Sequence, residues 1–189
     1  IFHPERSLTG FLSRRLERLE DALLEVEMCE GLRLLAGTGG SLNTANPAFQ
    51  TKQRLLRHLR QLDCDVLLMD IGAGSHYHAL DFFLAADHHL VVSTPEPTAT
   101  VDVYKFIKLA AIRKVLSVFV TRSRIGAELA RRDFTSVQEI LDLTGQADVE
   151  ARALAEQTLA AFRPLLILNR TGQAGSRLNT AQLRKVLRD

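Results

Sequence analysis

The residues best suited to chemistry lie in one stretch, where an apolar run ends in the carboxylate of Asp70 and a glycine turn follows. The run, 66–69, reads Val-Leu-Leu-Met, which is typical of a buried strand. Such a strand delivers Asp70 to the carboxyl edge of a sheet, where open α/β sheets bind their ligands. Gly72 and Gly74 permit a close approach of the backbone to a ligand. Strands that end in an aspartate before a glycine turn also occur without any site, so the motif alone leaves both interpretations open.

Two more apolar runs end in polar turns. Residues 89–93 lead into the turn 94–98, Thr-Pro-Glu-Pro-Thr, and residues 165–168 lead into Asn169. Because parallel strands share a carboxyl edge, we expect Asp70, Thr94 and Asn169 to lie together. The side chain of Asn169 has both a hydrogen-bond donor and an acceptor, which suits recognition of a base, although it could equally cap a turn.

Two weaker patterns are set aside. The run 37–41, Gly-Thr-Gly-Gly-Ser, lacks the Gly-Lys-Ser/Thr ending of a phosphate-binding loop and is interpreted as an ordinary loop. His76 and His78 fall on one side of an extended segment, but no third ligand follows at a spacing that suits a metal. The polar run 87–89 is interpreted as the approach to a strand.

Hydrophobic periodicity predicts the elements that position these residues. Strands are expected at 32–36, 65–70, 89–93 and 164–168. Helices are expected at 8–24 (as one helix or two short ones), 47–62, 80–86, 99–115, 135–143, 148–162 and 179–188. Expected helix signals are N-caps at Ser7, Thr98 and Asp148, a helix start at Thr135 or Ser136, and a break at Gly145. The pattern of 116–134 stays open. Continuous apolar strands between helices predict an α/β fold with a mainly parallel sheet and helices on both faces.

Composition fits one globular α/β domain over 1–189, with 46% hydrophobic and 24% charged residues and a formal net charge of +2. The two cysteines have no metal-ligand spacing and suit a reducing, cytoplasmic setting. No apolar run approaches the length of a membrane span. Four basic residues on the predicted helix 47–62 are interpreted mainly as a solvated face, with a nucleic-acid contact as the alternative; they are Lys52, Arg54, Arg57 and Arg60. The chain begins at Ile1 and in mid-pattern, so we expect a piece of a longer protein.

Several motifs, taken in order, resemble the MinD/ParA group of P-loop ATPases and are most similar to its MinD-like branch, which includes the FlhG/FleN flagellar-number regulators. The motifs are Asp70 with Gly72-Ala73-Gly74, Leu80-Asp81-Phe82-Phe83, Pro95-Glu96-Pro97-Thr98 with Asp102 and Tyr104, and the strand that ends at Asn169. The likeness runs from about Ser7 to the end of the chain and is weakest over 116–162.

The resemblance implies a P-loop NTPase-like fold that binds ATP and Mg²⁺. It implies that Asp70 is the Walker B acid at the metal, and that Gly72 and Gly74 belong to the switch that senses the γ-phosphate. Asn169 would lie at the adenine, and Pro95 and Glu96 near the base and the dimer interface. Such proteins form ATP-dependent homodimers, hydrolyse ATP slowly, and engage a membrane, DNA or a partner protein. The implied setting is the cytoplasm, with peripheral contact at the inner membrane in some members, and the implied process is control of flagellar number or of cell-division or cellular positioning.

The sequence departs from the family in one large respect. The Walker A loop, Gly-Lys-Gly-Gly-Val-Gly-Lys-Thr in the family form, and the following strand with the catalytic aspartate are absent from these residues. No catalytic residue is therefore assignable within the chain, and ATPase activity is expected only of a complete parent. Two alternatives stay open: a degenerate, non-hydrolysing scaffold, and a ParA-like DNA-binding partition protein suggested by the arginines over 113–132. The basic segment 179–188 is either a membrane anchor or, as its shortness favours, a docked surface helix.

Overall fold

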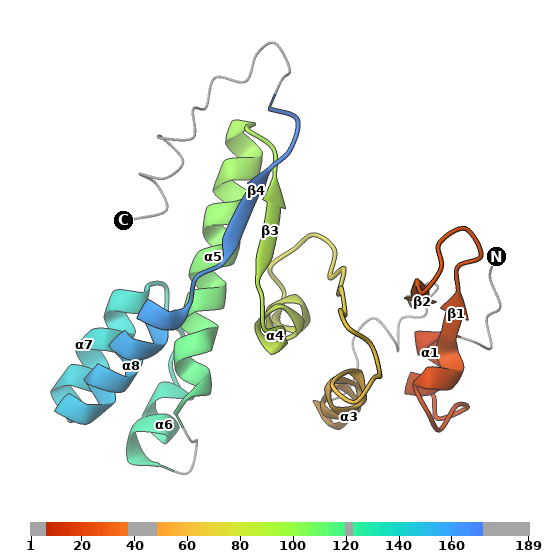
Figure 1. Ribbon diagram of the computed structural model, residues 1–189. Helices are drawn as coiled ribbons and strands as arrows, with labels where there is room; N and C mark the ends of the chain where they lie inside the picture. Colours follow the sequence, from red (N-terminus) through yellow and green to blue (C-terminus); the bar gives the residue numbers. More distant parts are fainter. Residues whose placement is uncertain (1–6, 38–48, 120–122, 172–189) are drawn as a thin grey trace. The chain divides into compact units, whose positions relative to one another are not determined.

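The computed structural model describes residues 7–37, 49–119 and 123–171. The chain divides into two compact units, Ile1–Met69 and Asp70–Asp189. Over the described residues the architecture is mixed α/β, with seven α-helices, one short 3-10 helix and two sheets of two strands each. Figure 1 shows these elements in the order of the chain. Within that described part, none of the helices combines the length and apolar character that crossing a membrane requires.

The first unit begins with a helix shorter than predicted. Helix α1 spans Leu8–Leu12 and is followed by turns and by the 3-10 helix η1, Glu20–Ala22. A single helix over 8–24 is therefore wrong, and the alternative of two short helical segments agrees with the structure. Arg14 adopts a left-handed backbone conformation (φ 61°), which no α-helix tolerates, so the apolar spacing of this stretch is realised by turns.

The remaining elements of the first unit are a hairpin and one long helix. Strands β1, Leu23–Glu25, and β2, Arg33–Leu35, pair antiparallel, and helix α3 spans Phe49–Leu59. The strand predicted at 32–36 is confirmed, but it belongs to this hairpin. The helix predicted at 47–62 is confirmed from Phe49, but it ends at Leu59, three residues before the predicted end.

Basic side chains of α3 pack inside the first unit. The guanidinium of Arg54 lies 4.1 Å from the centre of the buried Phe11 ring and donates hydrogen bonds to the carbonyls of Phe11 and Glu17. His58 meets the same ring edge-on at 5.0 Å, and Lys52 is also buried. The solvated face expected for this helix is thus wrong at Lys52 and Arg54, whereas Arg57 and Arg60 are exposed as expected. Arginine and lysine stems cover apolar surface well.

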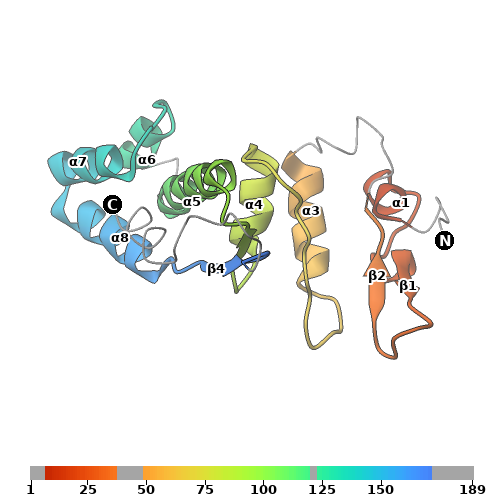
Figure 2. The ribbon, with the colours of Figure 1, turned by 90° about the horizontal axis from the view of Figure 1, so that it is seen from above.

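The second unit is built on a parallel pair of strands. Strand β3, Leu90–Ser93, pairs with β4, Leu165–Leu168, in a register that places Leu90 opposite Leu165 and Ser93 opposite Leu168. Helix α4, Tyr77–Ala85, precedes β3, and the 21-residue helix α5, Pro97–Ser117, follows it. Figures 1 and 2 show α5 lying along one side of the strands. The core here consists of Leu80 and Phe83 of α4, Val91 of β3, and Val103 and Ala110 of α5.

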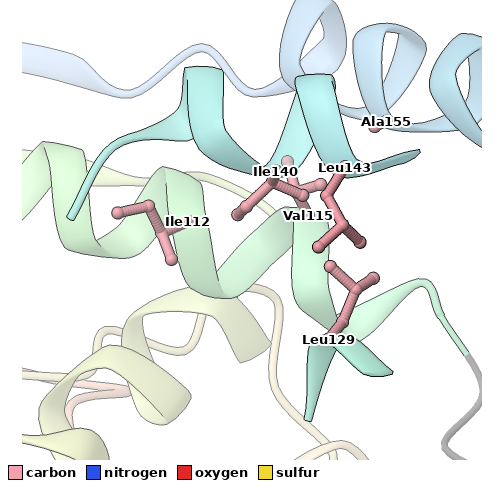
Figure 3. Close-up of a cluster of buried hydrophobic side chains, with 6 residues drawn as sticks. All are labelled: Ile112, Val115, Leu129, Ile140, Leu143 and Ala155. Carbon is pink, nitrogen blue, oxygen red and sulfur yellow. The ribbon is translucent and has the colours of Figure 1, made fainter. Parts of the chain in front are cut away.

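Three helices gather around the C-terminal half of α5. They are α6, Arg124–Leu129, α7, Val137–Ala147, and α8, Val149–Ala161. Figure 3 shows the cluster that joins them to α5, made of Ile112, Val115, Leu129, Ile140, Leu143 and Ala155. The open stretch 116–134 is therefore resolved as the end of α5, a connection and α6 over its described residues.

Local capping signals explain where these helices begin. Ser136 and Asp148 accept hydrogen bonds from the backbone N–H groups of Glu139 and Glu150, as Ser and Asp at N-caps do. Two expectations are wrong. Thr98 lies inside α5, because Glu96 takes the N-cap position and Pro97 is preorganised for the first helical residue. Gly145 lies inside α7, which continues to Ala147, where the next N-cap follows at once.

The sheet differs most from the prediction. The strand expected at 65–70 is absent, and Val66 and Leu68 are 83% and 81% exposed. The described chain contains one parallel pair and one antiparallel pair, rather than a mainly parallel sheet with helices on both faces. A strand forms only where a neighbour satisfies its backbone, and residues 65–70 have no ladder partner among the described residues. The helix predicted at 179–188 lies outside the residues that the structure describes.

Candidate functional site

The carboxyl edge of the β3–β4 pair is the centre of the candidate site. The backbone N–H of Asn169 donates to the carbonyl of Ser93 across a distance of 2.7 Å, which extends the ladder by one residue beyond both strands. Asn169 and Thr94 therefore leave the sheet side by side, as the parallel arrangement predicts. Helix α5 begins three residues after Thr94, so its N-terminus lies at the same edge.

The turn between β3 and α5 is held firmly. Pro95 is buried, and Glu96 is exposed in the N-cap position of α5. The carbonyl of Glu96 accepts hydrogen bonds from both the backbone N–H and the hydroxyl of the buried Thr100, each at 3.0 Å. The carboxylate of Glu96 is well placed beside the positive end of the α5 dipole. These hydrogen bonds fix the turn beside Asn169. The ring of Pro95 is buried, and the carboxylate of Glu96 is exposed to solvent.

The side chain of Asn169 already has one structural task. Its Oδ1 accepts a 2.8 Å hydrogen bond from the backbone N–H of Arg170, which has a left-handed backbone conformation (φ 56°). Asn169 therefore caps the turn after β4, the alternative that the sequence left open. The two N–H donors of the carboxamide belong to an exposed residue, so the capping bond does not prevent the side chain from contacting a ligand.

Asp70 lies in a glycine turn, as predicted, but not at the end of a strand. Its Oδ1 accepts a 3.1 Å hydrogen bond from the backbone N–H of Gly72, which closes a small turn on itself. Gly72 and Gly74 have φ values of 69° and 119°, conformations that favour glycine. Ile71 packs against the core of β3, α4 and α5, which ties this turn to the second unit. Asp70 itself is exposed.

The number of metal-binding side chains near Asp70 limits the kind of metal site that it could form. No group of three or more His, Cys, Asp or Glu side chains that could hold a metal ion occurs among the described residues. Mg²⁺ in nucleotide sites is held by one or two carboxylates together with phosphate oxygens and water. A single exposed carboxylate such as Asp70 fits that use, in which the nucleotide supplies the other ligands. The rings of His76 and His78 lie 6.5 Å apart and edge-on to each other.

Sequence reasoning missed an ion pair between α4 and α5, the helices that precede and follow β3 in the chain. Arg113 of α5 donates to Asp81 of α4 at 2.5 Å, and its guanidinium lies 5.2 Å from the centre of the Tyr77 ring. Both charged groups are partly buried, so the pair is shielded from solvent more than a surface pair. The available signal was a lone acid within the apolar run of residues 79–86, since such an acid needs a partner once the helix packs.

His89 lies directly before β3, as predicted, but its side chain packs against aromatic residues. Its ring lies 4.9 Å from that of Phe83 and 5.4 Å from that of Phe162, centre to centre. Its backbone carbonyl accepts the N–H of Leu165 at 2.8 Å and so begins the ladder with β4. Burial, the charge of Lys114 and that of His88 lower the pKa of the His89 imidazole, against an opposing effect of Asp87. His89 is therefore a packing residue that favours its neutral form.

Comparison of the sequence with models of known protein families and with curated protein sequences finds no match. The functional argument therefore depends on the geometry of the second unit. That geometry provides a rigid turn at 94–96 beside Asn169, and a glycine turn carrying Asp70 on the same unit.

Proposed function

We propose that this chain is part of a MinD/ParA-like ATP-binding protein, which dimerises with ATP and Mg²⁺ bound and acts as a switch with slow ATP hydrolysis. The observation that carries the proposal is the shared carboxyl edge, where Asn169 and the turn 94–96 leave adjacent parallel strands. This edge is where open α/β sheets bind nucleotides. Control of flagellar number or of cell-division or cellular positioning is the proposed use of the switch.

The proposed roles follow the chemistry of each group. The carboxamide of Asn169 would pair with the edge of the adenine, while the buried Pro95 fixes the neighbouring turn and Glu96 lines its outer side. Asp70 would contribute one ligand to Mg²⁺, which supplies charge stabilisation for phosphoryl transfer when it is bound. Gly72 and Gly74 would let the backbone beside Asp70 rearrange around a phosphate.

The 189 residues contain no Gly-x-x-x-x-Gly-Lys-Ser/Thr loop, so no lysine is available for the β- and γ-phosphates. The chain by itself should bind ATP only weakly. Calorimetry should therefore compare it with the longest natural polypeptide that contains it. Tight, Mg²⁺-dependent binding by the 189 residues alone would reveal a phosphate site that the proposal lacks, and the segment 37–41 would be the first place to search.

Substitution of Asn169 tests the adenine contact. In a polypeptide that binds ATP, Asn169→Ala should weaken ATP binding by about 1–3 kcal/mol, because a polar group on the adenine is left without its hydrogen-bond partner. Asn169→Asp is the companion variant, since it keeps an acceptor for the N–H of Arg170 while it removes the donors and adds a negative charge. Competition titrations with ATP and GTP provide the readout. If Asn169→Asp binds both nucleotides as the wild type does, the side chain caps a turn and nothing more.

Substitution of Asp70 tests the metal role. Asp70→Asn removes the charge but keeps an oxygen that can accept the N–H of Gly72. In an ATP-binding polypeptide it should abolish Mg²⁺-dependent hydrolysis and ATP-driven dimerisation, with an unchanged far-UV circular dichroism spectrum. Light scattering with Mg²⁺-ATP and with EDTA-ATP measures the second effect. A variant that still dimerises only when Mg²⁺ is present would place the metal elsewhere.

The alternatives predict different outcomes. A degenerate scaffold would hydrolyse no ATP in any polypeptide that contains the chain. A DNA-binding partition protein would bind DNA with an affinity that falls steeply with salt. Among the arginines of 113–132, Arg113 and Arg132 form ion pairs with Asp81 and Glu128 at 2.5 and 2.7 Å.

A further inference from the structure

The glycine turn that carries Asp70 leads directly into α4. Ile71 packs in the core, and two residues after Gly74 the chain reaches His76, the N-cap residue of α4. A Cβ built on Gly74 would lie 3.3 Å from Nδ1 of His76, so this glycine lies close to the start of the helix. The position of the turn therefore depends on how firmly the first turn of α4 is held.

Arg113 of α5 contacts that first turn. Helices α4 and α5 lie side by side (Figure 2). The Nε of Arg113 donates to Oδ1 of Asp81 at 2.5 Å, and its guanidinium lies 5.2 Å from the centre of the Tyr77 ring. Tyr77 and Asp81 are four positions apart and share one face of α4, so a single planar guanidinium can bind both. One side chain of α5 thus holds two successive turns of α4.

Hydrophobic contacts hold the later part of α4. Leu80 and Phe83 pack in the cluster with Val103 of α5. Tyr77, the first residue of the helix, is 68% exposed. The apolar core therefore fixes the middle of α4, and the contact with Arg113 extends this anchoring to the first residue.

Helix α5 begins at the other part of the proposed nucleotide site. Its first residue, Pro97, follows the turn 94–96 beside Asn169, and Arg113 lies about 24 Å further along the same helix. Buried residues of α5 run from Thr100 to Val115, so packing holds nearly its whole length. One helix is therefore joined both to the turn beside Asn169 and, through Arg113, to the start of α4.

We propose that Arg113 is a positioning residue, which through Tyr77 and Asp81 fixes the first turn of α4 and thereby the glycine turn that carries Asp70. The use of this positioning, presentation of the Asp70 carboxylate to Mg²⁺, rests on the proposed function. A turn that moved freely would have to be ordered each time a ligand bound, and that ordering costs affinity. Arg113 removes part of that cost because it orders the turn in advance.

Nuclear magnetic resonance of the full 189-residue chain tests the proposal. Arg113→Met keeps a long apolar stem and removes the guanidinium. It should lower the backbone order parameter of Gly72 from about 0.85, a value typical of rigid backbone, to below about 0.6. The N–H of Leu80, which donates to the carbonyl of His76 at 3.2 Å, should exchange with solvent about tenfold faster.

Two further variants and two reference amides serve as controls. Asp81→Asn should reproduce the loosening, and combining it with Arg113→Met should add little, because both remove the same contact. Arg132→Met removes an exposed ion pair elsewhere and should leave Gly72 unchanged. The N–H groups of Leu165 and Asn169, which form ladder hydrogen bonds to β3 and its flanks, should keep their exchange rates.

Loss of order at Gly72 with unchanged exchange in the ladder supports the proposal. Faster exchange at Leu80 while Gly72 stays rigid would show that the ion pair only packs α4 on α5, and would overturn it. Equal acceleration at Leu80 and in the ladder would reveal general destabilisation and would also overturn it, as would no change in any signal.

These measurements need no nucleotide, so they are independent of the proposed function. In a polypeptide that hydrolyses ATP, Arg113→Met should lower kcat by about tenfold or more and change the KM for ATP less, because the metal ligand is misplaced. An equal effect on kcat with Gly72 still rigid would contradict the positioning role. A wild-type polypeptide without ATP binding would contradict the proposed function alone.

Discussion

Residues 66–69 and 165–168 are apolar runs of equal length, and each precedes a polar side chain of functional interest, Asp70 or Asn169. Only the second run is a strand. It pairs with β3, and its flanking hydrogen bonds join Leu165 to His89 and Asn169 to Ser93. The first run has no ladder partner among the described residues, and two of its side chains are more than four-fifths exposed.

The comparison teaches that an apolar run makes a strand only where a neighbour is present. Burial of side chains favours both runs equally, at about 25 cal/mol per Å² of apolar surface. The backbone decides between them, because each unpaired N–H or C=O that is taken from water costs free energy. Asn169 is consequently held at a defined edge, whereas Asp70 is positioned by its own turn and by the packing of Ile71.

The largest expected effect comes from placing a charge in each run. Leu166→Asp would bury an unpaired carboxylate beside α5 and should lower the free energy of unfolding by about 3 kcal/mol or more. Leu68→Asp, on an exposed side chain, should change it by no more than about 0.5 kcal/mol. Urea unfolding followed by circular dichroism measures both. Equal losses would mean that residues 66–69 are packed in solution, which would remove the contrast between the runs.

A smaller effect tests whether the turn after the first run is rigid. Gly72 has a φ of 69°, and a Cβ built there would meet no atom within 4 Å, so strain comes from the backbone alone. Gly72→Ala should therefore cost about 1 kcal/mol. Gly72→Asn is the control, because asparagine adopts this conformation more readily, and it should cost less. If both variants unfold like the wild type, the turn is loose despite the anchor at Ile71.

The smallest effect concerns the start of β3. Because the pKa of His89 is lowered in the folded state, the unfolded chain binds more protons below pH 6.5, the ordinary value. The contribution of this histidine to stability is complete above pH 6.5 and is lost as the pH falls below it. His89→Gln should flatten the fall in urea midpoint between about pH 7.5 and 5.5. His88→Gln is the exposed control and should leave most of that fall in place, because burial is the largest cause of the lowered pKa of His89 and the charge of His88 is a smaller one. The reverse result would contradict the packing of His89.

The sequence by itself determined the elements whose signals are local. Helices α3, α4, α5 and α8 follow from periodicity, Ser136 and Asp148 are N-caps, and the runs that became β3 and β4 end at the residues expected. It also predicted that Asp70, Thr94 and Asn169 lie at one edge of a sheet. The structure bears this out for Thr94 and Asn169, which follow paired parallel strands, whereas Asp70 follows no strand.

Only the tertiary structure decided the rest. It ended α1 at Leu12, left residues 65–70 without a partner, buried Lys52 and His89 at least in part, and paired Asp81 with Arg113. The physical reason is the range of the interactions. A helix satisfies its backbone from residues four positions away, so its signals lie within the segment. A strand, a buried charge and a packed histidine need partners from distant parts of the chain, and a local pattern cannot supply them.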